Sequence, residues 1–149
     1  MNRDTPTMRD CAERLIAYET RENKSSGTQT PADFRSCEKL RLHLATFMGN
    51  SGIRTLLLRS IALATVEVPW LVTVQVKADD HWEGLEELQT QLDPDEFFEG
   101  GVVLLTQLLG LLVAFIGANL TVRMVCEIWP KVPLNDLDFH NGREYEKAK

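Results

Sequence analysis

Of all the side chains in this sequence, those of its three histidines are best suited to acid–base, phosphoryl-transfer or metal-binding chemistry. His81 follows two aspartates, and His140 lies two residues after Asp138. Each grouping offers imidazole and carboxylate ligands, but neither has the spaced set of three or four ligands that a metal site needs. We therefore expect no metal and no cofactor at either position.

The third histidine lies in a segment with helical periodicity. The polar face of that helix is the row Ser36, Lys39, His43, Thr46 and Asn50. The stretch "LHLATFMGNSGIRTLL" resembles, in outline, the histidine phosphotransfer domains, whose phosphoryl carrier is an exposed histidine on a helical bundle. Such domains have Lys and a small residue three and four positions after the histidine, where this chain has Thr46 and Phe47. The sequence therefore predicts a solvated surface histidine.

Paired carboxylates occur at Glu86-Glu87 and at Asp95-Glu96. No candidate nucleophile or oxyanion donor accompanies them, so helix-terminal and surface roles explain them better than acid–base catalysis. The stretch "DPDEFFEG" has the wrong spacing for a calcium loop, and "GNSG" lacks the features of a phosphate-binding loop. We expect no enzyme, and rank an enzyme third among the classes considered.

Charge is distributed unevenly along the 149 residues. The net charge is -6, but residues 1–66 hold 10 Lys/Arg and 7 Asp/Glu, whereas residues 67–149 hold 6 and 15. An acidic chain is repelled by phosphate backbones, so we expect no nucleic-acid partner. The acids between 78 and 99 form either a solvated face or a docking surface for a basic patch, such as the N-terminal half of another subunit.

The three cysteines are Cys11, Cys37 and Cys126, which are far apart and in no metal-binding or redox spacing. The first two lie on apolar helical faces, where a free thiol behaves as a small hydrophobe. The N-terminus has no apolar stretch typical of a signal peptide. We expect a reduced, cytoplasmic chain, with a membrane-associated location as the alternative.

The chain predicts a mainly α fold in one domain, residues 1–130, followed by a polar, extended tail, 131–149. Two helices open with Thr-Pro, at 5–6 and 30–31, and the second buries Phe34, Cys37, Leu40, Leu44, Phe47 and Met48 before stopping at Gly49. A third helix spans about 51–66. Residues 71–84 are either a short β-hairpin or a continuing irregular helix. A short helix follows, and Asp93-Pro94 starts another, which Gly100-Gly101 are expected to kink.

The stretch "GGVVLLTQLLGLLVAFIGANLTV" has no charged side chain and belongs to a predicted long helix from Val102 to Trp129. Its length suits a membrane span, but Gln107 and Asn119 are costly in lipid. The Lys/Arg excess of residues 1–66 favours the inner side for the preceding part of the chain, yet Arg123 and Lys131 favour the same side for the part that follows. A helix that is apolar all round can instead be the central element of a soluble bundle. The row Gly110, Ala114 and Ala118 allows close helix approach in either setting. We favour the soluble bundle.

These observations predict a non-enzymatic interaction or regulatory protein that acts as a homo-oligomer or as a subunit of a larger complex. The expected partner is the chain itself or another protein. The residues proposed for contact are the small row named above together with Trp70, Trp82, Glu83, Glu86 and Glu87. On this hypothesis, charge reversal at the three glutamates weakens assembly. The alternative function is a small membrane-acting protein whose helix over 102–122 inserts into a bilayer.

Overall fold

The computed structural model describes residues 6–22, 31–77 and 82–132. Along the chain, these residues form α1 (Pro6–Glu22), α2 (Ala32–Thr65), the 3-10 helix η1 (Pro69–Thr73), β1 (Gln75–Val76), β2 (Trp82–Glu83), α3 (Leu85–Gln91), α4 (Pro94–Ile116) and α5 (Ala118–Ile128). The predicted mainly α bundle around one long apolar helix is confirmed. The predicted caps Thr5 and Thr30, His81, His140 and most of the predicted tail lie outside the described residues.

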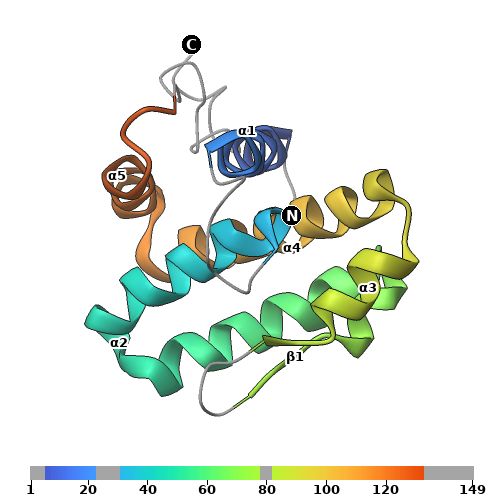
Figure 1. Cartoon of the computed structure of the whole chain (residues 1–149). Helices are drawn as coiled ribbons and strands as arrows, with labels where there is room; N and C mark the ends of the chain where they lie inside the picture. The colour runs from blue at the N-terminus through green and yellow to red at the C-terminus, as the bar shows by residue number, and fades with distance from the viewer. Residues whose placement is uncertain (1–5, 23–30, 78–81, 133–149) are drawn as a thin grey trace.

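The apolar helix α4 is the centre of the molecule. Every residue from Gly100 to Leu112 is buried, because α1, α2 and α5 all pack against α4. Figure 1 shows α4 crossing the middle of the fold, with α1 above it, α2 in front and below, and α5 near its end. Burying one Leu side chain contributes about 1.5–3 kcal/mol, so this helix supplies much of the stability of the fold.

Helix α2 is two helical arms joined at Gly49. The backbone there has φ 80° and ψ 161°, a conformation that is almost restricted to glycine. The chain folds back at this bend, so that both arms cover α4 (Figure 1). The predicted helix end at Gly49 is confirmed. The prediction that Phe47 is buried is wrong, because its side chain is 72% exposed beside the bend.

The predicted single helix from Val102 to Trp129 is wrong at both ends. The helix begins at Pro94 and stops at Ile116, and a separate helix starts at Ala118. Gly117 lies between them with φ 95° and ψ 157°. Its N–H donates to the Val113 carbonyl at 3.0 Å, and its own carbonyl accepts from the backbone N–H of Thr121 at 3.1 Å. One glycine thus ends α4 and begins α5.

The glycine pair expected to kink α4 instead lies inside a continuous helix. A Cβ added to Gly101 would be 2.4 Å from the carbonyl oxygen of Asp33, and one added to Gly100 would be 2.2 Å from Cη2 of Trp70. These two glycines therefore allow α4 to approach α2 and η1 more closely than any other residue would.

A short hairpin follows η1, as one of the two alternatives for residues 71–84 predicted. Strands β1 and β2 pair antiparallel, with Gln75 opposite Glu83 and Val76 opposite Trp82. The hairpin is shorter than the predicted range, because residues 71–73 belong to the 3-10 helix that begins at Pro69. Val72, Val74 and Val76 alternate with polar residues as in a strand, but Val72 lies in the 3-10 helix and only Val76 lies in β1.

Two indole–carboxylate hydrogen bonds, one partly buried and one buried, join the hairpin to α2 and the end of α5 to α1. Trp82 Nε1 donates to Glu38 Oε1 at 2.6 Å, and Trp129 Nε1 donates to Glu19 Oε2 at 2.8 Å. Glu19 is fully buried and its Oε2 also lies 2.5 Å from Lys39 Nζ. The second bond joins the end of α5 to α1 across 110 positions of sequence.

The glycine contact between α4 and α2 gives a direct test of the fold. We expect Gly101→Ala to lower the free energy of unfolding by about 1–3 kcal/mol, because the added methyl meets backbone that must shift. Gly52→Ala is the matched control, since its Cβ would meet only Met48 side-chain atoms at 3.4 Å or beyond on an exposed helical turn. We expect that variant to be neutral or more stable by up to about 1 kcal/mol. Urea denaturation followed by circular dichroism measures both, and equal effects would contradict the close packing.

Candidate functional site: an uncharged end and an acidic recess

The residues that the sequence proposed for contact do not form one surface. Gly110 is buried, Ala114 is exposed, and Ala118 belongs to α5, beyond the turn at Gly117. The predicted small-residue row is therefore wrong as a single helix face, because the helix that would carry it ends at Ile116.

The two proposed tryptophans have different surroundings. Trp82 is buried and bonded to Glu38, and so holds the hairpin to α2. Trp70 is half-buried and stacks on Phe97, with ring centroids 6.0 Å apart and an interplanar angle of 11°. Of the two indoles, Trp70 is the one that solvent reaches.

The three proposed glutamates are exposed and lie together in sequence on β2 and the first turn of α3. Glu83 pairs with Lys77 across the hairpin at 3.6 Å, whereas Glu86 and Glu87 lie where the helix dipole favours negative charge. They form a solvated acidic face at the end of the molecule where α4 begins.

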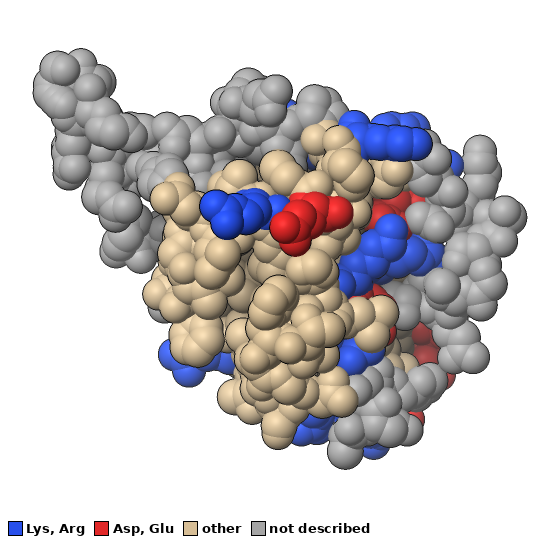
Figure 2. All heavy atoms as spheres, turned by 90° about the vertical axis from the view of Figure 1, so that its left-hand side faces the viewer, with Lys and Arg blue, Asp and Glu red and all other residues tan. Residues whose placement is uncertain are grey.

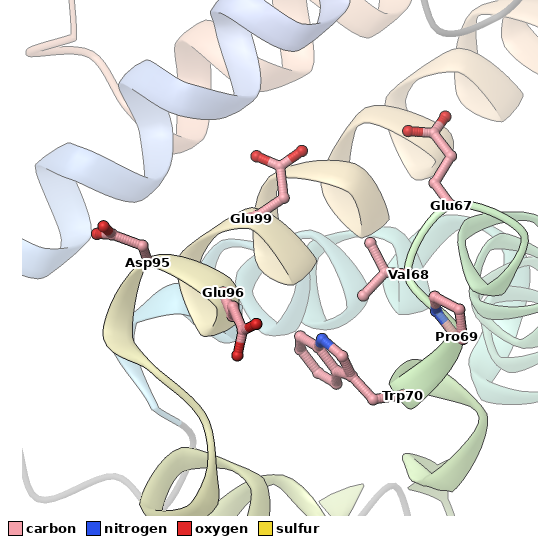
Figure 3. Close-up of a pocket in the computed structure, with 7 residues that line it drawn as sticks. All are labelled: Glu67, Val68, Pro69, Trp70, Asp95, Glu96 and Glu99. Carbon is pink, nitrogen blue, oxygen red and sulfur yellow. The ribbon is translucent and has the colours of Figure 1, made fainter.

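A recess of about 290 Å³ opens beside Trp70, between η1 and the first turns of α4. Its lining residues are Glu67, Val68, Pro69, Trp70, Asp95, Glu96 and Glu99. Figure 3 shows the carboxylate of Glu96 directed toward the indole, and that of Asp95 directed away from it. Sequence reasoning missed this grouping, because Glu67 and Trp70 come from a segment about 30 residues before α4.

An aromatic ring beside carboxylates attracts cations. The structure gives three of these acids other roles: Glu99 lies 2.5 Å from the guanidinium of Arg9, and Asp95 and Glu96 stabilise the N-terminus of α4. Among the described residues, no group of three His, Cys, Asp or Glu side chains is placed to hold a metal ion.

His43 is partly covered, in contrast to the solvated position that the sequence predicted. Its Nε2 lies 3.7 Å from Glu127 Oε1 on α5, and its ring contacts that of Phe47 with centroids 5.5 Å apart. His43 therefore links α2 to α5 and borders the exposed Phe47 side chain.

The end of the molecule that holds both glycine bends has almost no charge. No charged residue occurs between Arg41 and Arg54, around the first bend, or between Glu99 and Arg123, around the second. Figure 2 faces this end and shows a broad uncharged expanse, crossed by one basic and one acidic side chain side by side. The large apolar side chains exposed in these two segments are Leu42 (55%), Phe47 (72%), Phe115 (68%) and Leu120 (49%). We call this surface the uncharged end.

Comparison of the chain with protein-family models, with curated proteins and with solved structures finds no match in any of the three. Within the described residues, one helix, Pro94–Ile116, is long and apolar enough to cross a membrane. In the fold, 67% of its most apolar stretch is buried by other parts of the protein. The core helix of a soluble protein has the same length and composition, so this observation does not select a bilayer.

The three free thiols differ sharply in exposure. Cys11 and Cys37 are buried, and Cys126 is exposed on α5. Burial raises the pKa of Cys11 from its ordinary 9.0 to about 12, and burial also raises the pKa of Cys37. Above pH 9 the Cys11 thiol ionises in the unfolded chain but stays protonated in the folded one. The buried thiol therefore lowers the free energy of unfolding progressively as the pH rises from about 9 toward about 12.

This difference predicts one reactive thiol per chain. In dilute native protein at pH 8, we expect a maleimide to modify Cys126 within minutes and to spare Cys11 and Cys37. In denaturant, all three should react. Intact-mass spectrometry with peptide mapping measures this, and Cys126→Ser is the control that should leave the native protein unlabelled. Rapid native labelling at Cys37 would contradict the described core.

Proposed function

We propose that this protein is a non-enzymatic assembly protein that works in the cytoplasm by binding a second copy of itself through the uncharged end. The observation that carries the proposal is the exposure of Phe47 and Phe115 on a surface without charge. Exposed aromatic side chains of this size on an uncharged face are typical of protein interfaces.

The distribution of charge supports a second copy as the occupant. The net charge of -6 makes two copies repel each other in most orientations. The acids of the recess lie at the start of α4, and the uncharged end lies at its other terminus. The 23 residues of α4 separate the two by about 34 Å. Contact through the uncharged ends therefore keeps the acidic ends of both copies well beyond a Debye length.

Insertion into a bilayer is the second candidate, and the length and apolar composition of α4 favour it. The packing argues against it. Every residue from Gly100 to Leu112 is buried against other elements. Exposing this helix to lipid would require α1 and both arms of α2 to leave it, with loss of the whole core.

Aromatic truncation tests the proposal. We expect Phe47→Ser and Phe115→Ser each to weaken self-association at least tenfold, because central aromatic side chains supply most of the binding energy of such contacts. Val66→Ser and Val72→Ser are the matched controls, since these valines are 81% and 67% exposed but lie outside the uncharged segments. Gel filtration with light scattering over a concentration series measures the mass of each variant.

Three results would overturn the proposal. The first is a wild-type chain that stays monomeric at all concentrations. The second is loss of assembly on charge reversal at Glu83, Glu86 and Glu87, which would place the contact on the acidic face. The third is flotation of the protein with vesicles of phosphatidylcholine and phosphatidylglycerol that depends on Phe47 and Phe115, which would make a bilayer the occupant.

A further inference from the structure

Helix α5 presents one outward face beside the uncharged end. Asn119, Leu120, Arg123, Cys126 and Glu127 are all exposed and recur every three to four positions, so they form one stripe along the helix. Within this stripe the only charged side chains are Arg123 and Glu127, which lie one turn apart and carry opposite charges.

The two charges of this stripe are not paired with each other. No ion pair joins Arg123 to Glu127, and no carboxylate of the described residues lies within 4.0 Å of the Arg123 guanidinium. The order basic-then-acidic four residues apart is the less favourable one within a helix. Glu127 is instead held toward α2, with its Oε1 3.7 Å from His43 Nε2.

We propose that α5 is the specificity-determining element of a two-fold dimer, in which Arg123 of each copy pairs with Glu127 of the other. This inference rests on the proposed self-assembly and adds its geometry. A two-fold contact is self-complementary, so residue i facing residue j requires j to face i. Two antiparallel α5 helices satisfy this when the two-fold symmetry axis passes between them at the level of Val125, because each Arg123 then lies opposite a Glu127 of the other copy.

The neighbouring residues fit this arrangement. Cys126 lies next to the two-fold axis, so the two copies of its thiol come close together. Leu120 lies one turn from Arg123 and covers the end of the stripe nearest Gly117. His43 is a positioning residue, since it contacts both Glu127 and the ring of Phe47 and so joins the charged pair to the apolar part of the interface.

Charge exchange separates this geometry from other modes of assembly. We expect Arg123→Glu and Glu127→Arg each to weaken the dimer at least tenfold, because like charges then meet twice across the axis. The double variant carrying both changes should regain the wild-type dimer. An equimolar mixture of the two single variants should form a heterodimer, because one copy supplies two acids and the other two bases.

The control is the exposed pair Lys77 and Glu83 on the hairpin, whose residues are six positions apart, opposite in charge and 3.6 Å from each other. Lys77→Glu and Glu83→Lys should leave the mass of the assembly unchanged. Circular dichroism and thermal unfolding of each variant show that the fold is intact. Sedimentation velocity on the full chain measures the masses, with one partner fluorescently labelled in the mixture.

A short bis-maleimide gives a second readout that does not depend on charge. We expect it to link Cys126 to Cys126 of the partner copy in the wild-type protein, and Cys126→Ser to abolish the linked species. A dimer that needs Phe47 and Phe115 but ignores both charge changes and the cross-linker would overturn the α5 geometry and leave the proposed function standing. A monomer at all concentrations would overturn both.

Discussion

The fold depends on α4, a helix that has no polar face to expose to water. Most surface helices bury one stripe and solvate the other, but from Gly100 to Leu112 α4 carries apolar or small side chains at every position except Gln107, and all of them are buried. Such a helix is stable in water only if other elements enclose it. The enclosing helix α2 must therefore turn back on itself, and α1 must also pack against α4. The rest of the architecture follows from this one requirement.

Enclosure is completed by devices that bring distant parts of the chain together. Gly100 and Gly101 remove the side chains that would hold α4 away from Trp70 and α2. The buried carboxylate of Glu19 accepts hydrogen bonds from the Trp129 indole and from the partly exposed Lys39, so the end of α5 is fixed against α1. Satisfying this buried charge at two partners makes its burial tolerable.

The sequence predicts the elements well where a local signal decides them. Asp93-Pro94 marks the start of α4, and Gly49 marks the bend of α2, because proline and glycine restrict the backbone whatever surrounds them. The break at Gly117 was not predicted because the local sequence does not distinguish this glycine from Gly110. Gly110 lies seven residues earlier in the same apolar run and stays helical. What distinguishes the two is tertiary: the chain must leave α4 at Gly117 for Trp129 to reach Glu19.

The candidate site was harder to predict than the fold, for the same reason. Phe47 fits the apolar stripe of its helix and was expected inside, yet the bend two residues later carries it to the surface. The uncharged end joins two segments about 70 residues apart, and only the fold shows that they meet. The acidic recess likewise brings Glu67 to Glu96 and Glu99 from separate elements.

At Gly49 and Gly117, exposure to solvent does not bring tolerance to substitution, although the two usually go together. Both glycines are exposed, and a Cβ atom added at either would meet no atom within 4 Å. The space around the Cβ position is therefore open, while the backbone angles essentially restrict the position to glycine. Over evolutionary time these two surface positions should drift as little as the buried leucines between them, and a tolerance map based on solvent exposure would misjudge both.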